Sequence, residues 1–548
     1  MVRVKSVVVI LLTLVASSGR AQEHQHAPNG EKLGTVHFAT SCKEMAQVEF
    51  NRAVALLHSF QFIRAIDGFN AVLGADSTCG IAYWGIALSD WSNPFAPGAK
   101  EKSQLQTGRD NAERGWAIGA KTEREREYIA AVGKLYKDFQ STEQQTRLIA
   151  YRDAMEEVAA KYPDDHEAQI FYALAVAASE DPADKSYAGR LKAGAILEKL
   201  FEEEPTHPGL AHYIIHAYDV PALAEKGVVA ARRYSEIAPD APHALHMPSH
   251  TFTRTGYWQE SIDSNRAAGT AARGEGQTAE ELHASDYEIY AYLQTGQDDA
   301  AGQILKSLPE IATRFDPKLV ISGAGGPSVG YFALAAIPAR YALERQDWNQ
   351  AMQLGVRETP FPYTDAMTWF ARGYGAARLG QTTQAKESGT ALQQIEERLS
   401  KSNEPYWALQ VEIQQVSLAA WSALAAGKQE DALRQMKLAV ELEEGTEKSA
   451  VTPGPLAPAR ELLGEMFLQM NEPARALEQF EATLKKEPGR FRALYGAARA
   501  TQLSGNCDAS QKYFLELLTV CIRADKPGRT ELREAQRAVL RNCTLGPD

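Results

Sequence analysis

The sequence predicts an all-α fold, an α-solenoid built from antiparallel helix pairs. Apolar residues recur at positions i, i+3, i+4 and i+7 along almost the whole chain, which is the pattern of amphipathic helices. Tight turns join these short segments, as at Thr295-Gly296-Gln297 and Leu379-Gly380-Gln381. No alternating apolar and polar pattern of strand length is sustained. Short turns make successive helices antiparallel neighbours, and stacked pairs of such helices form a superhelix.

The composition is that of a folded chain with an acidic balance. Of the 548 residues, 44% are hydrophobic and 23% are charged, which excludes a disordered chain. The 58 basic and 70 acidic residues give a net charge of −12. We therefore expect no nucleic acid as a partner, because phosphate binding needs a basic face. No apolar stretch of about 18 residues occurs, so no membrane span is expected.

Residues 1–21 have the organisation of a signal peptide. Arg3 and Lys5 form a basic start, residues 7–16 are an apolar run, and Ala21 suits cleavage before Gln22. The apolar run is too short to span about 30 Å of hydrocarbon. We therefore expect an exported protein, periplasmic or extracellular, whose mature chain begins with a flexible segment at 22–39.

The five cysteines fall into an N-terminal pair and a C-terminal trio: Cys42 and Cys79, then Cys507, Cys521 and Cys543. Disulfides persist in proteins that are exported to oxidising compartments. The N-terminal pair flanks the first helix pair, whose two antiparallel passes return the chain to its start, so we expect these two cysteines to be bridged. One cysteine of the trio is left over as a free thiol, and the spacing does not decide which.

A repeat of 34 residues is clearest near the C-terminus. If Ala457 is position 1 of a unit, the small residues Gly464 and Ala476 fall at positions 8 and 20, Phe480 at 24 and Pro488 at 32. This pattern resembles the tetratricopeptide repeat, and the chain resembles secreted bacterial proteins of that family. The resemblance implies helix pairs whose small residues let two helices approach and whose proline ends the second helix.

Weaker units of the same pattern set the expected domain layout. The solenoid is expected at 40–442 and further repeats at 459–548. Between them, residues 443–458 are rich in proline and glycine, which predicts a long exposed connection. A second interruption, at 316–330, is glycine-rich and fits either a lid or an irregular joint. The G-x-S-x-G string at its end is not a nucleophile elbow, because Pro327 marks the start of a helix.

Histidines are concentrated in one part of the chain, where seven of the twelve lie within residues 207–283. A pair at i, i+4 recurs after 34 residues, first as His212 and His216 and then as His246 and His250. This spacing places both rings of a pair on one helix face. In the tetratricopeptide family these positions line the concave groove, so the resemblance implies a His-rich groove at 207–290.

These residues suit a transition-metal site, because neighbouring helices about 8–10 Å apart bring their imidazoles together. Imidazole nitrogens favour Zn²⁺ or Cu²⁺, with iron as a further candidate. The predicted metal ligands are His212, His216, His243, His246, His250, His283 and Asp286. The residues predicted to bind or position a ligand beside them are Asp219, Arg254 and Tyr290.

Three functions stay open at this point. The leading one is a scaffold that binds a metal ion in its groove, with or without a peptide or protein partner. The alternatives are a metalloenzyme and a metal-free interaction scaffold whose histidines only pack. Because unperturbed histidine has a pKa near 6.5, metal binding is expected to weaken from pH 7 to about 5. His58, on an apolar helix face, is expected to be structural.

Overall fold

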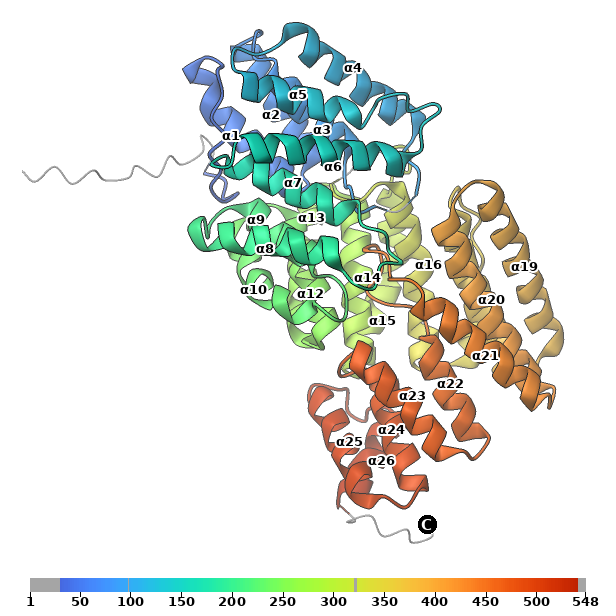
Figure 1. The fold of residues 1–548 in the computed structure, drawn as a ribbon. Helices are drawn as coiled ribbons and strands as arrows, with labels where there is room; N and C mark the ends of the chain where they lie inside the picture. Colours follow the sequence, from blue (N-terminus) through green and yellow to red (C-terminus); the bar gives the residue numbers. More distant parts are fainter. Residues whose placement is uncertain (1–29, 97, 320–322, 541–548) are drawn as a thin grey trace, which may run out of the picture.

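The computed structural model describes residues 30–96, 98–319 and 323–540 (Figure 1). The predicted signal peptide lies outside these ranges, as do residues 22–29 of the segment expected to be flexible. Residues 30–39 of that segment are packed onto the fold. The Phe38 ring is fully buried against Phe50, Trp84 and Tyr128. The backbone N–H of Thr35 also donates to a carbonyl far along the chain.

Within the described ranges the chain is an all-α solenoid of antiparallel helix pairs and contains no strand, as predicted. The first helices are α1 (Glu44–His58), α2 (Phe62–Ala75), α3 (Ile81–Trp91), α4 (Lys102–Ile118), α5 (Glu123–Lys134), α6 (Gln144–Lys161), α7 (His166–Ala178), α8 (Ala188–Glu203), α9 (Pro208–Ala217), the short 3-10 helix η1 (Ala224–Gly227) and α10 (Val228–Ile237). The central helices are α11 (Pro242–His246), α12 (Pro248–Thr255), α13 (Trp258–Gly274), α14 (Thr278–Gln294), α15 (Asp298–Arg314), α16 (Pro327–Glu344) and α17 (Trp348–Met352). The last helices are α18 (Pro362–Arg378), α19 (Thr382–Lys401), α20 (Pro405–Ala425), α21 (Gln429–Glu444), α22 (Ala459–Gln469), α23 (Pro473–Lys486), α24 (Phe491–Leu503), α25 (Cys507–Val520) and α26 (Thr530–Leu540).

The predicted repeat chemistry explains how the C-terminal helices pack. Gly464 on α22 and Gly496 on α24 both face the Phe480 ring of α23. A Cβ atom at Gly464 would lie 2.9 Å from that ring and one at Gly496 only 2.4 Å from it, so a larger residue at either position would push the helices apart. The predicted turn at Gly296 has a positive φ of 68°, which glycine adopts without strain.

The solenoid curves so that distant helices meet. In Figure 1, α1–α7 form one end of the molecule, α9–α14 lie in the middle and α22–α26 form the opposite end. The C-terminal repeats join the middle through specific bonds. The Trp258 indole donates to the carbonyl of Gly489 at 3.1 Å, and the backbone N–H of Phe491 donates to the Gln294 side chain at 3.0 Å.

The connection between α21 and α22 differs from its prediction, because most of it is buried. We call residues 446–458 the strap. Thr446, Glu447 and Val451 are each less than a tenth exposed. The Tyr287 hydroxyl lies 3.0 Å from two strap carbonyls, and Arg340 donates to the strap at 2.7 and 2.9 Å. Glycine and proline therefore shape a segment that crosses the middle of the solenoid.

The cysteine predictions are confirmed where the structure describes them. Cys42 and Cys79 form a disulfide with a Cα–Cα distance of 5.1 Å. In the C-terminal trio, Cys507 is disulfide-bonded and Cys521 is a buried free thiol. The leftover cysteine is therefore Cys521.

Removing the N-terminal disulfide is expected to destabilise the first repeat. The bridge joins residues 37 apart, so the variant Cys42→Ala/Cys79→Ala should unfold with a free energy lower by about 3–4 kcal/mol. Urea unfolding of parent and variant measures the difference. Cys521→Ala serves as a control, since it removes a buried thiol but no bridge, and should cost only about 1 kcal/mol. Equal stability of the double variant and its parent would contradict the prediction.

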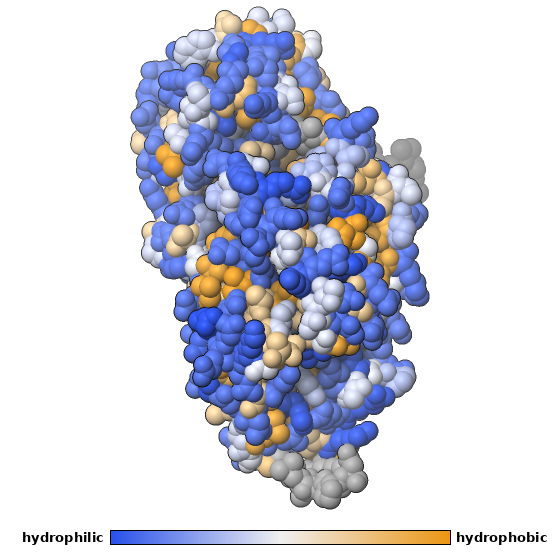
Figure 2. Space-filling view, turned by 90° about the vertical axis from the view of Figure 1, so that its right-hand side faces the viewer, coloured by the Kyte–Doolittle hydropathy of each residue, from blue (hydrophilic) through white to orange (hydrophobic). Residues whose placement is uncertain are grey.

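The surface is mostly hydrophilic on the face that Figure 2 shows, with hydrophobic side chains gathered in a recess near the middle. None of the helices in the described ranges is both long and apolar enough to cross a membrane.

Candidate metal centre

Four helices bring the predicted histidines together. Proline at the first positions of α9, α11 and α12 supplies a backbone angle suited to a helix start. The helices α11 and α12 are separated only at Met247, whose backbone is itself helical. The fourth helix, α14, carries His283. All six histidines of the predicted set are buried, with at most 8% of any side chain exposed.

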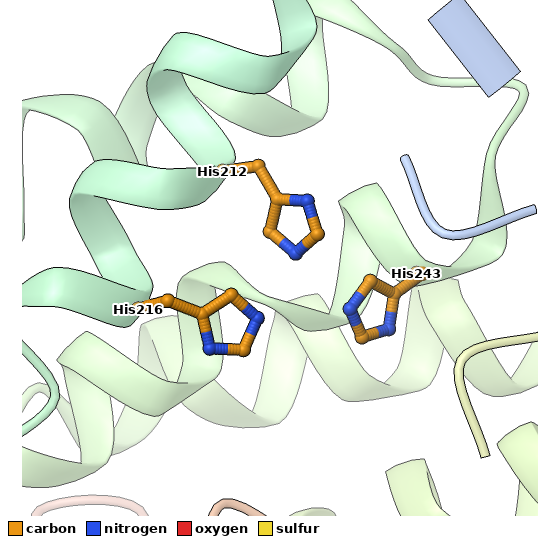
Figure 3. A group of neighbouring side chains, drawn as sticks. All are labelled: His212, His216 and His243. Carbon is orange, nitrogen blue, oxygen red and sulfur yellow. The ribbon is translucent and has the colours of Figure 1, made fainter. Parts of the chain in front are cut away.

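The first group of ligands consists of His212, His216 and His243. One nitrogen of each ring lies within 4.8 Å of the others. Figure 3 shows the three rings around a common point, each turning a nitrogen toward the other two. The Nε2 atoms of all three are buried and make no hydrogen bond. Buried polar atoms are nearly always paired, so three converging unpaired nitrogens indicate a missing ligand.

The second group consists of His246, His250 and His283, again with one nitrogen each within 4.8 Å of the others. The Nε2 atoms of His246 and His250 are 3.0 Å apart. Nitrogen ligands on one tetrahedral zinc ion, at about 2.0–2.1 Å from the metal, are about 3.3 Å from each other. The ring of His283 lies 4.4 Å from that of His246.

Hydrogen bonds at Nδ1 decide which nitrogen carries the proton. His212 Nδ1 lies 2.6 Å from the carbonyl of His58, which can only accept. His246 Nδ1 lies 2.7 Å from the Asn265 Oδ1 atom. The Asn265 amide nitrogen donates elsewhere, so Oδ1 is the accepting atom here. In both rings the proton is therefore on Nδ1 and the lone pair on Nε2, the form that ligates metals.

The same holds for His250, whose Nδ1 lies 3.0 Å from a carboxylate oxygen of Asp219. The two Nε2 atoms that face each other in the second group therefore each present a lone pair and carry no proton. Neither His246 nor His250 can donate to the other while its proton stays on Nδ1. A cation between them would satisfy both nitrogens at once.

Burial keeps five of these imidazoles neutral. Loss of hydration lowers the pKa of His250 to about 4, against the favourable effect of Asp219, and the pKa of His283 to about 3. Burial first, and then neighbouring imidazoles, hold the pKa of His212, His216 and His246 well below the ordinary value. Neutral imidazole is the form that binds metal.

Asp219 and Arg254 lie beside the histidines, but they face each other. Arg254 Nε donates to Asp219 at 2.9 Å, and Lys448 of the strap approaches the same carboxylate at 3.4 Å. Burial opposes ionisation of Asp219, but the charges of Lys448 and Arg254 outweigh it and hold the pKa of that carboxyl well below its ordinary value. Asp219 therefore orients the His250 ring instead of offering a free ligand atom.

Asp286 and Tyr290 share the His283 helix but turn away from the imidazoles. The Asp286 carboxylate is paired with buried Arg340, whose Nε lies at 2.8 Å. The Tyr290 hydroxyl lies 3.1 Å from Glu487 and accepts from Arg490 at 2.8 Å. The spacing i, i+3, i+7 does place them along one side of α14, but a helix buried on every side meets different partners along its length. Asp286 belongs to no group of convergent metal-ligand atoms in the described chain.

A third group of convergent side chains was not predicted. His58 Nε2 and His207 Nε2 lie 2.9 and 3.1 Å from the two oxygens of buried Glu167, and the Tyr213 hydroxyl lies 3.0 Å from His58 Nδ1. His58 thus has a buried hydrogen-bond partner on each ring nitrogen, in line with the structural role expected of it. Local spacing could not identify Glu167 as a member of this group, because its two partners are 109 and 40 residues away in sequence.

A narrow cavity opens beside both main groups. It touches His216 and His243 of the first group and His250 and His283 of the second. Its other walls include Phe95, Met247 and Val329, together with residues of the glycine-rich interruption and the strap. The Phe95 ring stacks on His216 with ring centroids 4.0 Å apart. Such a cavity can admit a molecule about as small as water to a metal held by the imidazoles.

Comparisons with known proteins give a fold likeness only. No protein-family model and no curated protein matches the sequence. The human IFIT1 dimer with m7Gppp-AAAA is similar over 81% of this chain and 90% of its own, at 10% identity and a TM-score of 0.36. The human IFIT1 dimer with PPP-AAAA is similar over 81% and 91%, at 9% identity and a TM-score of 0.38. The expectation that this chain binds no nucleic acid stays a prediction.

Proposed function

We propose that this helical-repeat protein is a metal-binding protein whose six buried imidazoles hold two transition-metal ions side by side. The observation that carries the proposal is the set of buried ring nitrogens that have no hydrogen-bond donor. Three Nε2 atoms converge without a partner in the first group, and two more face each other at 3.0 Å in the second. An orphaned buried acceptor costs about 1–3 kcal/mol, which bound ions would remove.

Two ions fit better than one because the six ligands divide into two sets of three. Between the sets, the ring centroids of His243 and His246 are 5.9 Å apart and those of His216 and His250 are 6.2 Å apart. Each set offers three nitrogens and leaves a coordination position open. Export is part of the proposal, and the Cys42–Cys79 disulfide supports an oxidising compartment.

Metal analysis of protein purified without an affinity tag tests the proposal. After incubation with Zn²⁺ or Cu²⁺ and removal of loosely bound ions, the chain should retain two equivalents. One equivalent would reduce the centre to a single site. Retention of less than half an equivalent of every transition metal tried would overturn the proposal, and the histidines would then be a polar lining for another ligand.

Acidification should release the metal only when the protein unfolds. The folded imidazoles have pKa values lowered to about 4 for His250 and about 3 for His283, whereas unfolded histidine titrates near 6.5. Below about pH 6.5 the unfolded chain therefore binds more protons than the folded one. Each such histidine then removes stability, by up to about 1.4 kcal/mol per pH unit, as pH falls toward the folded pKa.

We therefore expect the metal to stay bound at pH 5.5. An ordinary histidine pKa predicts instead that metal is lost at a higher pH. Circular dichroism and metal release, followed in the same acid titration with a chromogenic chelator, should change together below that pH. A gradual loss of metal centred near pH 6.5, with helix content retained, would contradict the expectation.

A further inference from the structure

We infer that the two groups of imidazoles take a pair of copper(I) ions and that this pair binds one molecule of dioxygen. The inference rests on the proposed function, because it requires an ion in each group. It goes further by naming the metal, its oxidation state and the ligand that enters from the cavity.

The charge of the site favours the singly charged ion. The ligand set is six imidazoles without a carboxylate. The nearby carboxylates are already engaged, since Asp219 is paired with Arg254 and Lys448, and Asp286 with Arg340. Among the described residues Glu280 also lies close, with its carboxylate 3.7 Å from His243 Nδ1.

Two zinc ions would therefore bring four positive charges into an enclosed site, whereas two copper(I) ions bring two. The free-energy cost of burying charge is several kcal/mol per ion even after relaxation, so the smaller total charge is favoured. Imidazole is a good ligand for copper, while magnesium, calcium and manganese prefer the carboxylate oxygens that this ligand set lacks.

The cavity favours a small uncharged ligand. It touches two histidines of each group, so a molecule in it reaches both ions. It is narrow, and Phe95, Met247 and Val329 make parts of its wall apolar. A charged ligand such as phosphate would lose its hydration there with little compensation. Dioxygen is uncharged and small, and each of its two atoms can contact one copper.

The electrons balance without a further reactant. Each copper(I) gives one electron to the bound dioxygen and becomes copper(II), so the dioxygen gains two electrons and no proton is needed. Departure of dioxygen reverses both transfers. The two copper(II) ions joined by the reduced dioxygen pair their spins, so they give no ordinary paramagnetic resonance signal.

The full chain, loaded anaerobically with copper(I) and then exposed to dioxygen, tests the inference. We expect two copper ions per chain, uptake of one dioxygen per two copper ions at an oxygen electrode, and a paramagnetic resonance signal from only a small part of the total copper. Two copper ions per chain without dioxygen uptake, or with the full signal of isolated copper(II), would overturn this inference and leave the proposed function standing. Failure to bind any metal would overturn the proposed function itself.

One substitution tests whether the two copper ions act as a pair, and a second tests whether dioxygen enters through the cavity. His216→Gln removes one ligand of the first group, so the second group should hold a single copper that is visible by paramagnetic resonance after oxidation. Val329→Phe places a ring in the cavity and replaces none of the histidines, and should slow dioxygen uptake at least tenfold with copper content unchanged. The control Val229→Phe adds the same ring at a side chain that is 67% exposed on α10, and should have no effect. Unaltered uptake in Val329→Phe, or a paired signal in His216→Gln, would count against the inference.

Discussion

Replacing His246 and His250 together by alanine is expected to abolish metal binding by the second group and to halve the metal content of the chain. The two Nε2 atoms are 3.0 Å apart and supply two of the three ligands of that group. A single imidazole, His283, cannot hold the ion against water. Metal analysis and calorimetric titration measure the loss directly.

The same variant should lose much of the thermal stabilisation that metal gives. An ion at 1,000 times its dissociation constant stabilises the folded state by about 4 kcal/mol per site, and this contribution from the second group would vanish. Helix content should stay as in the parent, because the rings occupy the inside of the cluster and not the small-residue positions where helix pairs meet. Melting curves with and without Zn²⁺ or Cu²⁺ show the difference.

His166→Ala is the matched control for this variant. His166 begins α7 and pairs with Glu204, outside every group that can hold a metal in the described chain. His58 would be a poorer control, because its ring bonds buried Glu167 and its removal would leave that carboxylate with one partner fewer. If the double variant binds metal as tightly and as fully as the parent, the second group is not a metal site.

Local periodicity was enough to predict the helices that carry the site. The 34-residue offset correctly aligned α9 with α11 and α12. The turn at Gly296 also follows from local chemistry, because glycine adopts the positive φ that the turn needs. The helix start at Pro327 follows in the same way, because the proline ring fixes φ at a helical value. Such features depend on a few neighbouring residues, and a single sequence contains them.

The partners of those residues could not be predicted in the same way. Asp219 meets Lys448, which lies 229 residues further along the chain, and Asp286 meets Arg340 across 54 residues. These contacts depend on the curvature of the whole solenoid and on the path of the strap. Curvature is the sum of small rotations between successive helix pairs, and no local pattern fixes that sum.

Exchange of Asp219 for asparagine is expected to destabilise the apoprotein. The carboxylate is buried between Arg254 and Lys448 and accepts from His250. Asp219→Asn keeps the shape and can still accept the His250 proton, but it removes the one negative charge in direct contact with both cations. Breaking a buried ion pair from one side costs about 3–5 kcal/mol, because the remaining charge stays buried.

Lys448 limits that cost. Burial, and then the charge of Arg254, already lower its pKa to about 8, although Asp219 raises it. Without Asp219 the pKa of Lys448 falls further, which limits the positive charge that stays buried, so the loss of stability should lie near 3 kcal/mol, the lower end of that range. Urea unfolding of the apoprotein measures this loss.

Metal affinity should fall independently of this loss. An amide oxygen holds the His250 ring in place but polarises it less than a carboxylate does, and a change of this kind beside a ligating histidine costs about 10–100-fold in affinity. The double variant Asp219→Asn/Lys448→Met separates the two effects. It removes one buried cation together with the anion, so most of the stability should return while the affinity for metal stays low. If Asp219→Asn alone is as stable as the parent and binds metal equally well, then the carboxylate neither balances the buried cations nor tunes His250, and the electrostatic account of the site is wrong.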